Sequence, residues 1–308
     1  MLKRKLILFF LFSFFSVAVK AQDIVFSNFP QHQFYYNPAF AGVDSGHVFS
    51  VTGRRAKDYF DNMPYYNSLL SYNQPLKNFK LGIAASALFH KSDIAVFSQL
   101  SFTCNHKFNL GKKMNLRLGA RATTGFLHYQ TPKNWDYYKQ FWEDSIPNIS
   151  KGHYYFSVGA RYEWCNFYFG VSINNLLFNE FYIAGDRENY HRNHGHRGTA
   201  IFTIANKFKM FNWVSTTPSI IFSPYEYFQI ANDLCLKKTL LLGCAFTPGA
   251  LALTKAFMLR GGICFKNKLQ AMFSYDFGQE GISFYGSDNQ YYYFNGLGTY
   301  EANIQYHF

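Results

Sequence analysis

The last eleven residues of the chain alternate strictly between apolar and polar side chains. The apolar residues share one parity and are Tyr300, Ala302, Ile304, Tyr306 and Phe308. Polar residues hold the other parity, from Thr299 to His307. Because successive side chains of a strand point to opposite faces, the pattern predicts a strand with one apolar and one polar face. Such a strand with a C-terminal aromatic residue is typical of a bacterial outer-membrane β-barrel.

The same two-residue period recurs from about residue 46 to the C-terminus. Fourteen segments show it: 46–56, 65–75, 79–90, 95–109, 113–129, 153–164, 165–177, 196–208, 212–224, 227–236, 239–247, 254–266, 268–277 and 298–308. Most have the roughly 9–11 residues that a tilted membrane strand needs.

The connections between these segments alternate in length. Those after even-numbered segments are tight, such as Leu76-Lys77-Asn78, whereas long connections follow odd-numbered ones, at 130–152, 178–195 and 278–297. Short periplasmic turns and longer external loops are typical of membrane barrels. An even strand number then predicts that both termini lie in the periplasm.

If these segments are barrel strands, lipid-facing and inward-facing residues separate cleanly. In segment 268–277, Leu269, Phe273 and Phe277 face lipid, while Ser274 and Asp276 face inward. An open sheet in lipid leaves backbone groups unsatisfied at its edges, so the sheet must close. The alternative, a soluble β-sandwich, would need a shared apolar core and would not pair a broad aromatic face with an Arg-bearing one.

The N-terminus has the pattern of a secretory signal. Lys3, Arg4 and Lys5 precede an apolar run from Leu6 to Val19, and a small residue follows at Ala21. We expect cleavage after Ala21, since the apolar run is short for a membrane anchor, the alternative. The predicted division is a signal peptide at 1–21, a plug or periplasmic segment at 22–45 and a transmembrane barrel at 46–308.

Composition agrees with alternating strands better than with membrane helices. The chain has 36 Phe and 24 Tyr, and 21% of its residues are aromatic, yet its mean hydropathy is only −0.16. No stretch after residue 21 has the ~20 apolar residues of a spanning helix. Four of the 30 basic residues lie in the predicted signal, so the mature chain has a net charge of +8. Export makes nucleic acid a poor explanation for that charge, and we expect no nucleic-acid partner.

A mixed set of charges is predicted to face the lumen. It comprises Arg117, Arg121, Arg161, Glu163, Asp233, Arg260, Asp276 and Glu301. Charges inside a narrow barrel are costly unless they are paired. We therefore favour a salt-bridge network that fills the lumen over the alternative, a substrate path.

Residues 22–45 show no strong strand pattern. Asn37-Pro38 favours a turn, because proline fixes φ and restricts the residue before it. The segment is rich in aromatic residues, unlike disordered chains. We expect it to fold into the barrel as a plug or to lie across the periplasmic mouth, rather than to be a disordered leader.

Enzymatic and metal chemistry find little support. The chain has no Gly-x-Ser-x-Gly or His-Glu-x-x-His motif and no phosphate-binding glycine loop, so we expect neither catalysis nor a cofactor. His191, His194 and His196 offer metal ligands, but their arginine neighbours favour a solvated loop. The five cysteines have neither zinc nor disulfide spacing.

One N-terminal element carries a family resemblance. Residues 34–42 read Phe-Tyr-Tyr-Asn-Pro-Ala-Phe-Ala-Gly, and further matches lie at 167–176 and 273–277. Through these residues, most specifically Asn37, Pro38, Ala39, Phe40, Ala41 and Gly42, the chain resembles the PorP/SprF family of type IX secretion membrane proteins from Bacteroidetes.

The resemblance implies a fold, a compartment and a role. The fold would be a fourteen-stranded, FadL-like barrel in the cell outer membrane. The role would be export or surface attachment of large proteins with type B C-terminal sorting domains, such as gliding adhesins. Its partners would be such an adhesin, other type IX secretion components and outer-membrane lipid. The alternative is a FadL-like transporter of hydrophobic small molecules.

Overall fold

A computed structural model gives the fold of the chain. It describes residues 26, 28–43, 46–57, 64–92, 95–130, 148–185, 198–224, 227–247, 256–266, 268–277, 283–285, 291–293 and 298–308. Among these residues, no helix is long and apolar enough to cross a bilayer. The candidate histidine loop and most of the three long connections lie outside the described residues.

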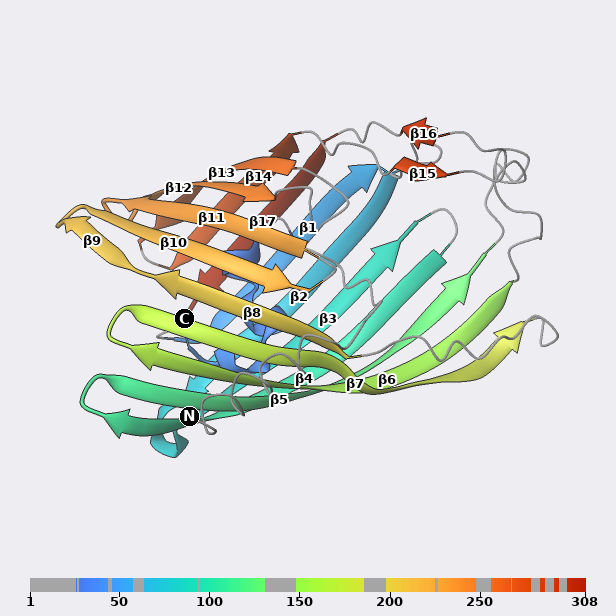
Figure 1. The fold of residues 1–308 in the computed structure, drawn as a ribbon, viewed down its shortest axis with the longest axis horizontal. Helices are drawn as coiled ribbons and strands as arrows, with labels where there is room; N and C mark the ends of the chain where they lie inside the picture. Colours follow the sequence, from blue (N-terminus) through green and yellow to red (C-terminus); the bar gives the residue numbers. More distant parts are fainter. Residues whose placement is uncertain are drawn as a thin grey trace, which may run out of the picture.

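Fourteen antiparallel strands of the described chain form one closed sheet (Figure 1). The first eight pair in sequence order: β1 (Val48–Lys57), β2 (Pro64–Leu76), β3 (Leu81–Lys91), β4 (Ala95–Gly111), β5 (Met114–Tyr129), β6 (Ile149–Trp164), β7 (Phe167–Gly185) and β8 (Thr199–Asn206). The other six are β10 (Val214–Ser223), β11 (Tyr227–Leu236), β12 (Leu240–Thr247), β13 (Ala256–Phe265), β14 (Leu269–Phe277) and β17 (Thr299–His307).

Closure comes from one pairing between the two ends of the barrel sequence and from the continuous pairing around β10. Strand β17 pairs with β1, with Val51 opposite Ile304. Strand β10 pairs with both β8 and β11, which joins the two halves of the sheet. The predicted all-β, fourteen-stranded barrel is confirmed.

Three short strands were not predicted. Strand β9 (Phe208–Phe211) extends the hairpin between β8 and β10. Strands β15 (Ser283–Tyr285) and β16 (Tyr291–Tyr293) form a separate small sheet within the long connection 278–297. Each has only three or four residues, too few for a two-residue period to stand out.

The closing strand shows how the pattern specifies the wall. On β17, Thr299, Glu301 and Asn303 are at most 2% exposed, whereas Tyr300 and Ile304 are about half exposed. The polar residues face the lumen and the apolar residues face outward, as the alternation predicts. Inward and outward residues separate in the same way on β5, where Arg117 and Arg121 are buried.

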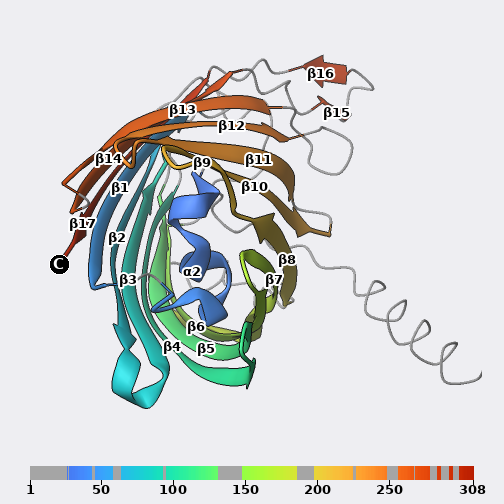
Figure 2. The same cartoon turned by 90° about the vertical axis from the view of Figure 1, so that its left-hand side faces the viewer.

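The N-terminal segment, described at residues 26 and 28–43, lies inside the barrel (Figure 2). It folds into three short helices: η1 (Phe29–Gln31), α2 (Gln33–Tyr36) and η2 (Pro38–Phe40). Nearly all of its described residues are buried or half-buried. The barrel therefore has a core in its lumen, built from this segment and the inward side chains of the wall.

Candidate functional site

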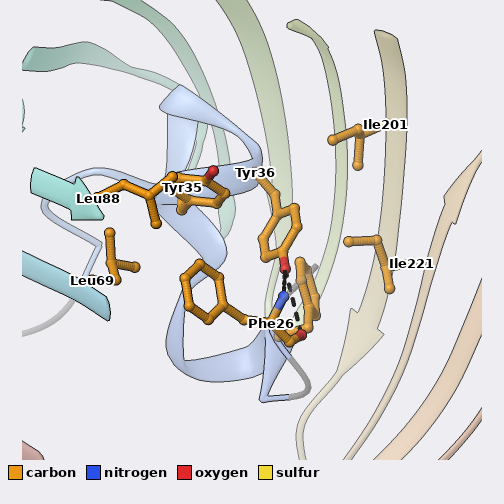
Figure 3. Packing of buried hydrophobic residues seen from close by; sticks show 8 residues of the cluster. Phe26, Tyr35, Tyr36, Leu69, Leu88, Ile201 and Ile221 are labelled. Carbon is orange, nitrogen blue, oxygen red and sulfur yellow. Dashed lines mark hydrogen bonds between the residues drawn. The ribbon is translucent and has the colours of Figure 1, made fainter. Parts of the chain in front are cut away.

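The apolar part of the N-terminal segment crosses the lumen. Phe26, Phe29, Tyr35 and Tyr36 form one buried cluster, and the Tyr36 hydroxyl lies 2.7 Å from the backbone nitrogen of Phe26, which donates to it. The cluster packs against Leu69 and Leu88 on β2 and β3 and against Ile201 and Ile221 on β8 and β10 (Figure 3). The segment thus contacts strands from both halves of the sheet.

Asn37 anchors the middle of the segment. Its side-chain oxygen accepts a hydrogen bond from the Ala39 nitrogen at 2.9 Å, which caps η2. Its side-chain nitrogen donates to the carbonyls of Ala160 on β6 and Val171 on β7, at 3.2 and 3.1 Å. The Asn37 amide therefore both caps η2 and joins it to the wall. Pro38 suits the first position of η2, because an N–H there would have no helical partner.

Glycines let the segment backbone touch the wall. A Cβ on Gly119 of β5 would lie 2.6 Å from the Pro38 carbonyl carbon, and a Cβ on Gly159 of β6 would clash with the Asn37 side chain. Gly42 has a φ of +62° and meets Gly82 of β3 backbone to backbone. Only glycine allows contacts this close, and only glycine takes that φ without strain.

Polar side chains of the wall satisfy the carbonyls of the segment. Asn105 on β4 donates to the carbonyls of Pro38, Ala39 and Ala41, and Asn174 on β7 donates to that of Tyr36. On β2, the Asn73 side chain accepts from the Gly42 nitrogen at 2.5 Å. Buried backbone groups need such partners, so the polar lumen and the segment are complementary.

Arg121 belongs to this same set of contacts. Its guanidinium donates to the carbonyl of Tyr35 and to the side chains of Ser157 and Asn174. The group also lies 5.5 Å from the centre of the Tyr35 ring. Arg121 thus holds the segment rather than an acidic side chain of the wall.

Arg117, Arg161 and Glu163 form a separate cluster on β5 and β6. Glu163 Oε1 lies 3.5 Å from Arg117 Nε and 3.0 Å from Arg161 Nε. The Arg161 guanidinium also stacks between Phe40 of η2 and Tyr168 of β7, at 4.3 and 4.4 Å from the ring centres. This cluster therefore also supports the segment, through a cation–π contact.

The remaining predicted charges pair in three places. Arg260 Nε on β13 lies 2.6 Å from Asp233 Oδ1 on β11. Asp276 on β14 faces Arg54 of β1, with 3.9 Å between carboxylate and guanidinium. Glu301 accepts from the backbone nitrogen of Asn28 at 3.1 Å and lies 3.7 Å from His32.

Strand parity therefore predicted eight charged residues on the inner face, but it did not predict all of their partners. Arg54 could have been found from the parity of β1, since it alternates with outward residues. His32 lies in the helical segment, where no strand period applies. The ion pairs of these charges lie at several places around the lumen: on β5 and β6, between β11 and β13, between β1 and β14, and between the segment and β17.

The lumen offers few reactive constellations. Within the described residues, no three His, Cys, Asp or Glu side chains come together as metal ligands. A cavity between the segment and the wall, lined by residues such as Phe34, Ser50 and Asn73, has a volume of only about 50 Å³. The arrangement is suited to holding a segment in place.

The sequence of the chain matches one family over most of its length. The family model described as type IX secretion system membrane protein PorP/SprF matches residues 18–293. This chain belongs to the PorP/SprF family. The family is one of type IX secretion system membrane proteins, and the membrane β-barrel described above fits that class.

Solved structures share the fold of this PorP/SprF protein. The CymD monoaromatic hydrocarbon channel is 8% identical and aligns over 90% of this chain and 92% of its own, with a TM-score of 0.56. The P. putida toluene transporter TodX is 9% identical over 88% and 92%, with a TM-score of 0.55. The Ralstonia pickettii toluene transporter TbuX is 6% identical over 89% and 93%, with a TM-score of 0.51.

At these identities the structural matches show the fold alone. Among curated proteins, no sequence matches this chain.

Proposed function

We propose that this PorP/SprF barrel supports export or surface attachment of large proteins with type B C-terminal sorting domains by docking them. The cargo would be an adhesin-like protein, such as one used in gliding motility. Other type IX secretion components would contact the barrel, and outer-membrane lipid would surround it. In this proposal the barrel is a binding platform and not a conduit.

The observation that carries the proposal is the occupied lumen. Residues 26–43 are held by hydrogen bonds from β2, β4, β5, β7 and β17. Their aromatic side chains pack against both halves of the sheet. A passage through the centre would have to break these contacts together, so residues 22–45 act as a plug, with Asn37–Gly42 as its anchor.

Orientation follows from the connections. The signal peptide, cleaved after Ala21, sends the chain across the inner membrane. The short turns, such as the one at Cys165, then lie in the periplasm and the long connections lie outside. Docking is assigned to those connections, at 130–152, 178–195 and 278–297, which fall largely outside the described residues.

The alternative function is transport of hydrophobic small molecules. A lateral gap in the wall would favour this function. Strand β7 runs to Gly185, but its pairing with β8 ends at Asn174 and Thr199. Among described residues, the end of β7 beyond Asn174 pairs only with β6. Against it stands the lumen, which is lined by arginine, asparagine and acidic side chains rather than by a continuous apolar track.

A co-purification experiment separates the two functions. The full chain, tagged and extracted from the outer membrane in detergent, is expected to recover a secreted protein with a type B C-terminal domain. Replacing residues 280–296 by a short Gly-Ser linker is expected to reduce that recovery at least tenfold. As a control, Lys237→Asn with Lys238→Asn changes a turn at the opposite rim, where both residues have positive φ, and recovery is expected to persist.

Two results would contradict docking. One is recovery of hydrophobic small molecules with no secreted protein. The other is equal recovery of the cargo by the linker variant and the unchanged chain. The yield and heat stability of each variant barrel show whether a loss reflects binding or folding.

A further inference from the structure

The outer wall of the barrel has a hollow over strands β2–β6. It has a volume of about 700 Å³ and is lined mainly by outward-facing side chains, among them Leu100 and Phe102, which are 64% and 58% exposed. A second hollow of about 450 Å³ adjoins it and shares Leu70, Ala87 and Leu100 with it. The outward apolar band of the wall is therefore grooved over these strands.

The grooves arise because large and small outward side chains alternate from one strand to the next, and not along a single strand. One cross-strand row reads Leu70, Ala87, Leu100, Thr124 and Tyr154, from β2 to β6. The next row reads Tyr72, Ala85, Phe102, Ala122 and Phe156. In both rows the side chains on β3 and β5 are small and those on β2, β4 and β6 are large. Two troughs therefore run along β3 and β5, with a ridge of Leu100 and Phe102 between them.

Two cations stand past the end of the β3 trough, beyond Phe89, which is 45% exposed and lines the second hollow. Arg55 on β1 is opposite Tyr66 on β2, which in turn is opposite Lys91 on β3, and all three side chains are exposed. The Arg55 guanidinium lies 6.0 Å from the centre of the Tyr66 ring. Among the residues that the structure describes, neither cation pairs with an acidic side chain.

The spacing of cations and troughs matches a lipid. Lys91 is four residues from Ala87 on the same strand, which is roughly 13 Å at strand rise. Each leaflet contributes about 15 Å of the hydrocarbon core, so the cations reach the headgroup level when the troughs lie in the core. In the orientation proposed above, that level belongs to the outer leaflet.

We propose that this surface binds a phosphorylated glycolipid with several acyl chains. Acyl chains would lie in the β3 and β5 troughs, on either side of the ridge, and phosphate groups would meet Arg55 and Lys91. Chains that diverge around a ridge need a wide headgroup, and two separate cations favour more than one anionic group. The site lies outside the barrel and is independent of cargo docking.

Native mass spectrometry of the full chain in detergent tests the proposal. The probes are diphosphorylated lipid A, its dephosphorylated form and phosphatidylglycerol. We expect lipid A to be retained at least tenfold better than either of the other two. One double variant, Ala87→Phe with Ala122→Phe, fills the troughs. A second, Arg55→Gln with Lys91→Gln, removes the cations. Each double variant is expected to lower lipid A retention at least tenfold.

Two outward positions provide controls. Ala302→Phe on β17 adds a bulky side chain elsewhere on the exposed wall. Lys266→Gln removes an exposed cation near the opposite rim. Both variants are expected to leave lipid A retention unchanged. The cation variants leave the wall packing intact and so test the site even where the trough variants fold poorly. Equal retention of all three lipids, or unchanged retention in the cation variants, would overturn the proposal.

Discussion

Strands β3–β7 and strands β11–β13 line different parts of one lumen and fill it by different means. The first group presents glycines and amide side chains, and the backbone of the N-terminal segment lies directly against it. The second group fills its part with its own side chains: the Arg260–Asp233 pair and a cluster of Ala231, Ala245 and Met258. One part of the wall is shaped to receive a segment, and the other is complete without it.

This difference separates two kinds of damage. A change on β3–β7 is expected to release the segment, whereas a change on β11–β13 is expected to weaken the wall and leave the segment bound. The two readouts are ion conductance in planar bilayers, for release of the segment, and urea unfolding, for stability of the barrel.

The largest effect is expected from Gly119→Val on β5. The added side chain would lie within 3 Å of the Pro38 and Ala39 backbones, which cannot move aside without lifting η2 from the wall. We expect conductance to appear and the free energy of unfolding to fall by about 3 kcal/mol, the upper part of the usual range for overpacking. Gly261→Val is the matched control, because a Cβ at Gly261 meets nothing within 4 Å. Gly261 lies on the outward parity of β13, so equal behaviour of the two variants would show that the close contact at Gly119 does not hold the segment.

A smaller effect is expected from Arg260→Met on β13. The change leaves Asp233 without the guanidinium that lies 2.6 Å from it. Loss of one partner from a buried pair is expected to cost about 2 kcal/mol here, below the usual value because Asp233 is a quarter exposed. The double variant Arg260→Met with Asp233→Leu is expected to recover most of this stability. Conductance should stay absent in both, and its appearance would show that this part of the wall also holds the segment.

The smallest effect is expected from Asn37→Ala. It removes the cap of η2 and the two hydrogen bonds to the wall carbonyls, which retain their sheet contacts. We expect a loss of about 1 kcal/mol, the usual cost of a missing cap. Brief openings in single-channel records should accompany it, and Asn28→Ala, at the other end of the segment, is expected to produce fewer. A fully silent Asn37→Ala variant would mean that the Asn37 side chain does not hold the segment in place.

Much of the barrel could be predicted because its period is local. Each of the fourteen strands alternates over eight or more residues, and the alternation alone says which face meets lipid. The prediction failed where the backbone departs from that period. Strand β7 continues eight residues past its predicted end, because Asn175 and Leu177 have φ values of +58° and +52° and interrupt the pattern.

The site was less predictable than the wall. The inward arginines and acidic residues follow from parity, but their partners depend on contacts between distant parts of the chain. His32 meets Glu301 across 269 positions of sequence, and no local pattern encodes that contact. Gly42 was singled out, but the wall glycines Gly119 and Gly159 were not, because a glycine in a strand gives no sign of what lies against it until the segment is in place.

One measurement tests most directly whether the N-terminal segment closes the lumen. It is the ion conductance in planar bilayers of the mature chain and of the same chain lacking residues 24–42. We expect the intact chain to be silent and the shortened chain to conduct steadily. An intact chain that conducts as well as the shortened one, or a shortened chain that stays silent while folded, would contradict it.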